Sequence, residues 1–248
     1  MGNGDIDQVK VFPRNAAAGL LLCLAPLMAD ASGLGPCSAF TDDATYVSST
    51  IIMQLEHRRV PLRVPIQYFE DAWDRVDGLE TTSQLFSVDI NDFTPVTRPQ
   101  TAERNKAGRH DYMWFTIGDQ ISTHDIALLE VNLGWNNPSL TQKLAQLPPA
   151  KGTRAGLVWL ETSAASGTTR PYADIFVALG PDGKDVVAAI ECSSPENETV
   201  AVPLCKQYFT AGKVDVDLSY DRTYLDRWSD IQADVTAFVN CATVQPKN

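Results

Sequence analysis

The chain is poor in the residues and motifs that mark familiar catalytic sites. It holds three histidines in 248 residues and contains no G-x-S-x-G, so the strand-to-helix turn that presents the serine of α/β-hydrolases is excluded. Residues 180–184 superficially resemble a phosphate-binding loop but lack its spacing and its following helix. These absences predict a chain that works without a cofactor.

Long hydrophobic runs are also scarce. The one candidate for a membrane helix is residues 16–28, which is interrupted by Pro26. A spanning helix needs roughly 20 apolar residues. We therefore expect no membrane span after this run, and we favour a secretion signal over a membrane anchor.

The residues around this run have the order of a signal peptide. Lys10 and Arg14 precede it, and the small-x-small sequence of residues 29–31 follows it. We expect residues 1–31 to be removed after export, which would leave residues 32–248 in the periplasm as a single domain.

A lipoprotein is the alternative at this terminus. Residues 34–36 precede Cys37 in a way that faintly resembles a lipidation motif. The proline directly before the cysteine fits that motif poorly, so cleavage by signal peptidase is favoured.

Charge points to the kind of partner. The formal net charge is −11, and loss of residues 1–31 leaves about −10. An acidic protein is repelled by phosphate backbones at long range, which disfavours nucleic acid. We expect a protein partner, and a basic effector would suit this charge. The alternative is that the charge serves solubility only.

The cysteines predict a disulfide framework. Cys23 lies in the expected signal peptide, and Cys37, Cys192, Cys205 and Cys241 remain. Four cysteines allow three pairings in an oxidising compartment. A local bridge from Cys192 to Cys205 would close a short polar loop, and Cys37 would then pair with Cys241. Zinc ligands usually lie two to four residues apart, a spacing that these cysteines lack, so no metal is expected.

Alternating and β-branched runs predict a mainly antiparallel sheet. Pro61 and Pro65 confine their run to an edge. Asp182-Gly183 between two apolar runs is the clearest hairpin signal. The predicted strands are residues 46–55, 60–68, 85–90, 112–117, 155–161, 173–179, 185–192, 204–211 and 213–219.

One strong helix pattern closes the chain. Apolar residues recur at three- and four-residue steps, with Asp221 or Thr223 available as a cap. Residues 139–147 predict a short helix, 94–108 a polar loop, and 121–135 fit a strand or a helix equally well. The class is α+β, with the last helix covering one face of the sheet. The apolar stripe consists of Leu225, Trp228, Ile231, Val235, Phe238 and Val239.

Histidines and serines offer weak catalytic candidates. His110-Asp111 and His124-Asp125 each form the His-Asp step that some metal-dependent phosphohydrolases use. His57 is the third histidine. Those enzymes are built on helices, and this region predicts strands and loops, so hydrogen-bonded or surface histidines are favoured. Ser163 and Ser166 are interpreted as loop residues.

Carboxylates are the basis of the second candidate function. Glu161 follows an aromatic-containing strand, where a glycosidase places an acid. Asp89 and Asp92 are close enough to suggest calcium, but the spaced ligands and glycine of a calcium loop are absent. A further cluster consists of Glu70, Asp71 and Asp74. The alternative to a binding protein is thus an envelope or polysaccharide-acting hydrolase.

Roughly the last 60 residues resemble a loosely defined set of exported proteobacterial proteins. The resemblance rests on Cys192 and Cys205, the strand 214–220, the pattern Leu225-x-x-Trp228-x-x-Ile231 with Phe238, and the proline-containing stretch 60–69. Some members are periplasmic immunity proteins against type VI secretion effectors. The resemblance implies an exported, non-enzymatic binding protein and assigns no functional residues.

Overall fold

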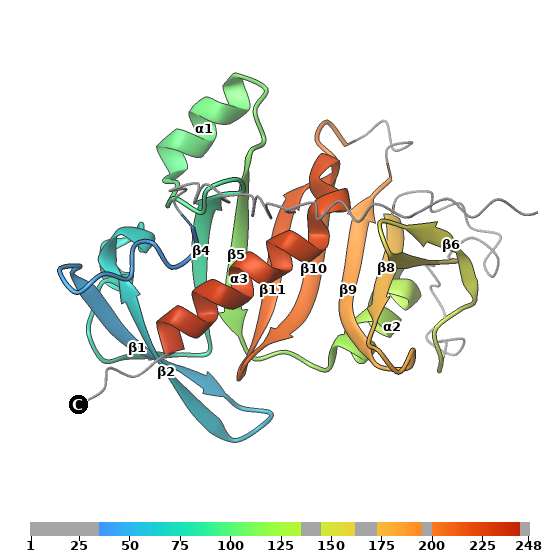
Figure 1. The fold of residues 1–248 in the computed structure, drawn as a ribbon, viewed down its shortest axis with the longest axis horizontal. Helices are drawn as coiled ribbons and strands as arrows, with labels where there is room; N and C mark the ends of the chain where they lie inside the picture. The colour runs from blue at the N-terminus through green and yellow to red at the C-terminus, as the bar shows by residue number, and fades with distance from the viewer. Residues whose placement is uncertain (1–34, 135–144, 162–172, 195–199, 244–248) are drawn as a thin grey trace, which may run out of the picture. The chain divides into compact units, whose positions relative to one another are not determined.

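An eight-stranded antiparallel sheet forms the centre of the molecule (Figure 1). A computed structural model describes residues 35–134, 145–161, 173–194 and 200–243. The strand order is β4-β5-β11-β10-β9-β8-β7-β6. The strands are β4 (Ser83–Asp89), β5 (Tyr112–Gly118), β6 (Ala150–Arg154), β7 (Leu157–Leu160), β8 (Ala173–Leu179), β9 (Val186–Ser193), β10 (Leu204–Ala211) and β11 (Val214–Asp221).

A smaller sheet has the order β2-β1-β3. It contains β1 (Tyr46–Met53), β2 (Arg58–Pro65) and β3 (Leu79–Thr81). β1 and β2 form the expected hairpin, and β3 runs parallel to β1. β2 is an edge strand, as its two prolines predict, because proline has no N–H to donate to a further strand.

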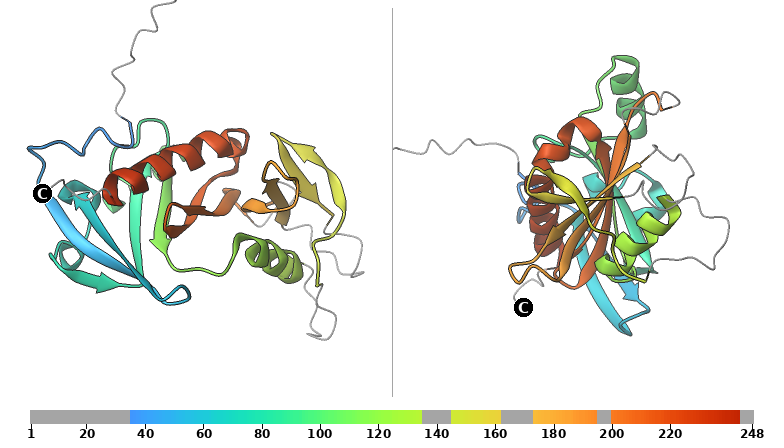
Figure 2. Two further views of the ribbon diagram at one scale, coloured as in Figure 1. Left: turned by 60° about the horizontal axis from the view of Figure 1, so that its bottom comes forward. Right: turned by 90° about the vertical axis from the view of Figure 1, so that its right-hand side faces the viewer.

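The helices are α1 (Arg98–Lys106), α2 (Thr123–Gly134) and α3 (Trp228–Thr243). The described residues also form short 3-10 turns: η1 (Ile66–Tyr68) and η2 (Ala72–Asp74) lie between β2 and β3, and η4 (Arg222–Arg227) precedes α3. Figure 2 shows α2 and α3 on opposite sides of the large sheet. None of the described helices has the length and apolar character needed to cross a membrane.

α3 covers one face through the apolar stripe. Phe238 lies at its centre and is fully buried. Its ring centroid is 4.9 Å from that of Tyr68 and 5.4 Å from that of Phe115, so the helix joins η1 to β5. Trp228 is half-buried, and its indole N–H donates to the Ala155 carbonyl at 2.8 Å. The fully buried members of the stripe are Leu225, Ile231, Val235, Phe238 and Val239.

α2 covers part of the opposite face. Side chains of successive strand residues point to opposite faces, and β8 shows this directly. Phe176 belongs to the core under α3, whereas Ile175 and Val177 pack in a second cluster with Ile126 and Val131 of α2. The last helix therefore covers one face, as the sequence predicts, and α2, formed by the segment 121–135 that fits a strand or a helix equally well, covers β8 and β9 on the other face.

The described residues contain two disulfides, one local and one that joins distant parts of the chain. Cys192 pairs with Cys205 across β9 and β10, with Cα atoms 4.0 Å apart. Cys37 pairs with Cys241 at a Cα distance of 6.0 Å and ties the start of the described chain to α3. These are the pairings that the sequence favours. With its sulfur in a disulfide, Cys37 has no thiol on which a lipid can be attached.

The expected polar loop at 94–108 is wrong, because α1 lies there. Helix α1 has no buried residue and no apolar stripe, so hydrophobic periodicity gives no signal for it. β3 and β6 were also missed, since each is short and polar. Most of the helix expected at 139–147 lies outside the described residues.

Candidate functional site

A hollow of about 430 Å³ opens on the sheet face opposite α3. Met113 and Phe115 of β5 belong to the core under α3, so Tyr112 and Trp114, which alternate with them, point to the other side. Leu204 of β10 lies on the same side, because its neighbour Cys205 is in that core. The lining residues are Asn105, His110, Tyr112, Trp114, Val202, Leu204, Tyr220 and Asp221.

Trp114 is the central residue of this surface. It lines the 430 Å³ hollow and also a second, smaller hollow of about 130 Å³. Its ring meets that of Tyr112 edge-to-face, with centroids 5.3 Å apart. Leu85, which also lines the smaller hollow, is 55% exposed. Two hollows that meet at an aromatic residue, beside an exposed leucine, are typical of a surface that binds another molecule.

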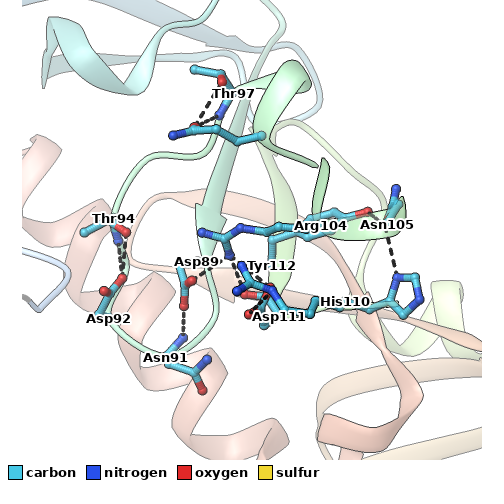
Figure 3. A network of polar contacts seen from close by, with 12 residues as sticks. Asp89, Asn91, Asp92, Thr94, Thr97, Arg104, Asn105, His110, Asp111 and Tyr112 are labelled. Carbon is cyan, nitrogen blue, oxygen red and sulfur yellow. Dashed lines mark hydrogen bonds and ion pairs between the residues drawn. The ribbon is translucent and has the colours of Figure 1, made fainter. Parts of the chain in front are cut away.

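Arg104 fixes α1 beside this surface (Figure 3). Its Nη1 lies 2.6 Å from the Asp89 carboxylate on β4, 3.1 Å from the Asp111 carboxylate and 3.2 Å from the Asp111 carbonyl oxygen. The Arg104 and Asp89 side chains are 17% and 14% exposed. This well-shielded contact holds a helix that has no apolar face.

Asn105, next on α1, positions two lining residues. Its Oδ1 accepts a hydrogen bond from the Tyr112 hydroxyl at 2.8 Å and lies 3.1 Å from Nδ1 of His110. Figure 3 shows His110 beside Asn105, away from the Arg104 contact. The polar edge of the hollow is thus held in place by the end of α1.

The start of α1 is held by charge and by capping. Gln100 Oε1 accepts from the Thr97 N–H at 2.8 Å, as in a capping box. The Glu70 carboxylate accepts from the Arg98 N–H at 2.7 Å, and Asp71 lies 2.6 Å from the Arg98 guanidinium. An anion at a helix N-terminus is stabilised by free N–H groups and by the dipole.

Asp221 supplies the carboxylate of the hollow. It is only 8% exposed. Its Oδ1 accepts from the Thr223 N–H at 2.8 Å and from the Thr223 hydroxyl at 2.7 Å, which is the cap expected at the start of the final helical segment. Within the described residues, no hydrogen bond is seen to its Oδ2.

The acidic candidates from the sequence serve structural contacts. Asp89 binds Arg104, and Asp92 accepts from the Thr94 N–H at 2.9 Å and from its hydroxyl at 2.7 Å. Glu70 and Asp71 hold α1, as described above. A glycosidase needs two carboxyl groups facing one another across a substrate cleft. Because the Glu70 and Asp71 carboxylates are engaged by Arg98, this acidic cluster does not supply such a pair.

In both His-Asp steps the aspartate contacts residues other than histidine. His110 faces Asn105, while Asp111 faces Arg104 and also Arg109 at 3.5 Å. Asp125 accepts from the Ser122 hydroxyl at 2.6 Å, and its N–H donates back to that oxygen at 3.1 Å. This is a reciprocal cap at the start of α2. His57 lies in the β1–β2 turn, and Ser163 and Ser166 lie outside the described residues.

Three carboxylates from distant segments meet at the other end of the sheet. Oxygen atoms of Glu56, Asp119 and Asp215 lie within 4.8 Å of one another, the one such group found among the described residues. Asp119 Oδ2 accepts from the Gln54 and Leu55 N–H groups at 2.6 and 2.9 Å. These bonds hold the β1–β2 turn against the end of β5.

A half-buried acid, Glu130, lies on α2 and faces the sheet. The Tyr208 hydroxyl donates to Glu130 Oε1 at 3.3 Å. Burial of the Glu130 carboxyl, with the charge of Glu191 close by, raises its pKa to about 7. The contact joins α2 to β10.

No local sequence pattern predicts the hollow around Trp114. Its residues come from α1, β5, the segment before β10, and the end of β11, so no local motif contains them. The one available signal was the aromatic pair Tyr112 and Trp114 at positions i and i+2, which places both rings on one face of a strand.

Comparison with known proteins gives structural relatives only. No family model matches the chain, and no curated protein matches it. Smlt3025, an immunity protein of the Stenotrophomonas maltophilia type IV secretion system, matches 83% of this chain and 98% of its own, with 16% identity and a TM-score of 0.53. The Neisseria meningitidis iron-regulated outer membrane lipoprotein FrpD matches 79% of this chain and 92% of its own, with 10% identity and a TM-score of 0.46. The chain and Smlt3025 have a common fold.

Proposed function

We propose that this chain is a periplasmic immunity protein that binds and neutralises a secreted effector without turnover. The observation that carries the proposal is the fold in common with Smlt3025, an immunity protein, over 98% of that chain. Two disulfides support export, because disulfides persist in oxidising compartments. The signal-peptide pattern of residues 1–31 supports the same location.

The local chemistry supports binding over catalysis. Among the candidate catalytic residues, Glu70, Asp71 and Asp89 lie in ion pairs, Asp92 and Asp125 form caps and turns, and His57 lies in a turn. The described lining of the 430 Å³ hollow consists of aromatic, apolar and amide groups, the imidazole of His110 and one carboxylate. Such a lining suits recognition of a partner side chain.

Two secretion systems are candidates for delivery of the effector. The resemblance of the tail implies a type VI effector, whereas Smlt3025 belongs to a type IV system. A toxin gene beside the gene of this chain would identify the effector to test first. A neighbouring polysaccharide locus would instead favour the envelope hydrolase.

A protection assay tests the proposal. The neighbouring toxin is directed to the periplasm of a susceptible bacterium, with or without this chain carrying residues 1–31. We expect growth to be restored only when the chain is exported, and we expect the purified pair to elute as one complex. A toxin that kills equally in the presence of the exported, folded chain would refute the immunity role.

A second variant separates binding from catalysis. His57, His124 and Glu161 are replaced together by glutamine, because these candidate catalytic residues lie outside the hollow. Protection at the wild-type level is expected if the chain acts by binding. Loss of protection in a variant with an unchanged unfolding midpoint would favour an enzyme.

A further inference from the structure

The hollow around Trp114 combines an aromatic wall with a negative charge. Tyr112 and Trp114 form the wall, and Asp221 is the acidic lining residue. Among the described residues that line the 430 Å³ hollow there is no lysine or arginine. Aromatic faces and a shielded carboxylate both favour a cation, so the lining is complementary to positive charge and lacks a cation of its own.

Asp221 has an oxygen available for a ligand. Its Oδ1 is used by Thr223, and no hydrogen bond to its Oδ2 is seen within the described part of the chain. The residue as a whole is 8% exposed. The side-chain atoms that are fully buried without a hydrogen-bond partner do not include its Oδ2. This oxygen therefore retains access to solvent, and Asp221 borders the hollow.

From these observations we propose that the hollow receives an arginine side chain of the effector. A guanidinium is planar, stacks on indole and phenol rings, and donates to a carboxylate through several N–H groups. Lysine, with a compact and strongly hydrated ammonium, suits stacking less well. The net charge of about −10 that remains after loss of residues 1–31 would also draw a basic protein toward the chain before contact. This inference rests on the proposed function, because it places the effector on this surface.

Neighbouring features fit a protein partner rather than a small cation. Leu85 is 55% exposed, and Trp73, in η2 between two lining residues of the smaller hollow, is 70% exposed. Exposed aromatic and aliphatic side chains around a central pocket are typical of protein interfaces. The arginine would enter the larger hollow while the surrounding apolar groups meet the rest of the effector.

The arginine preference is tested without the effector. The folded, disulfide-bonded chain is labelled with ¹⁵N and titrated with acetyl-Gly-Arg-Gly-amide, and separately with the citrulline peptide of the same shape but no charge. We expect the indole resonance of Trp114 to move with the arginine peptide, and the citrulline peptide to bind about tenfold more weakly. Added salt should weaken the arginine response. Equal binding of both peptides, or no movement at Trp114, would overturn the proposal.

The effector contact is tested by substitution. Trp114→Ala removes the aromatic wall, and Trp159→Ala is the matched control, because it removes a half-buried indole from β7. The unfolding midpoints of the two variants are recorded first. We expect Trp114→Ala to lose the response to the arginine peptide and to weaken protection at least tenfold. We expect Trp159→Ala to keep the peptide response and the protection. Full protection by a folded Trp114→Ala variant would overturn the proposal that the effector binds at this surface. That result would not affect the proposed immunity role. The immunity role would be refuted only if the wild-type chain failed to protect.

Discussion

Nη1 of Arg104 lies 2.6 Å from Oδ2 of Asp89, and this single contact joins α1 to β4. Both side chains are shielded from solvent, and the same guanidinium reaches Asp111 at 3.1 Å. Since α1 has no buried residue, charged and capping contacts take the place of a hydrophobic face. Asn105 forms one wall of the Trp114 hollow, and these charged and capping contacts of α1 hold it in place.

Arg104→Ala should destabilise the chain. It would leave the Asp89 and Asp111 carboxylates without their cation, at a cost of roughly 2–3 kcal/mol in the free energy of unfolding. Arg59→Ala is the control, because its ion pair with Glu80 is exposed and should contribute less than about 1 kcal/mol. Urea denaturation measures both. Equal losses would show that the Arg104 contact is no stronger than a surface pair.

Phe238→Ala should cost about 3–5 kcal/mol, because it removes the ring at the centre of the core under α3. Trp228→Phe should cost only about 1 kcal/mol, because it keeps most of the apolar contact and loses the hydrogen bond to Ala155. Thermal and urea denaturation compare the two. A larger loss for Trp228→Phe would reverse our ranking of the two α3 positions.

Loss of the Cys37–Cys241 bridge should be severe. The bridge closes a sequence separation of 204 residues, and the loop-entropy model gives about 5 kcal/mol for a closure of that size. The Cys37→Ala, Cys241→Ala double variant is compared with the oxidised wild type by urea denaturation. Peptide mapping without reductant checks the pairing first, and a loss below about 1 kcal/mol would contradict the expectation.

Glu130 should make stability fall as pH rises. Its pKa is raised to about 7 by burial and by the charge of Glu191, from an ordinary value of 4.5. The folded chain therefore holds the proton more tightly, so unfolding becomes easier as pH rises from about 4.5 to about 7. After allowance for solvent screening, the effect is about 1–2 kcal/mol.

Glu130→Gln should remove this pH dependence. The variant should gain stability over the wild type at pH 7.5 and show little difference at pH 4.5, because the wild-type acid is then protonated in the folded state. The difference between the two proteins across pH isolates Glu130 from the other carboxylates. A difference that is constant with pH would reject the assignment.

Export should remove residues 1–31. The charged start, the apolar run 16–28 and the small residues at 29–31 motivate this expectation. Intact mass measurement on protein recovered from the periplasm should give a chain that begins at Ser32. Recovery of the full-length mass, with Met1 retained, would contradict it.

Local patterns predicted much of the sheet and the last helix. The β8–β9 and β10–β11 hairpins were recognised from turn residues that the structure explains, because Gly183 and Gly212 have φ values of +69° and +61°, a region that favours glycine. The apolar periodicity of α3 predicts a helix because the apolar residues of its stripe face one large core. α2 stayed ambiguous because a short apolar segment fits a strand or a helix until its neighbours are known.

Composition and local patterning are therefore sufficient to predict the α+β class, the alternation of apolar residues along the strands, the even number of cysteines after residue 31, and the acidic charge. Each is carried by residues close together in the chain or by simple composition. The tertiary structure alone decided α1 and the Trp114 hollow. Helix α1 depends on Glu70, Asp89 and Asp111, all outside the helix, and the hollow is built from residues that extend from Asn105 to Asp221. Contacts of such long separation leave no periodic signal, because they exist only once the strands have paired.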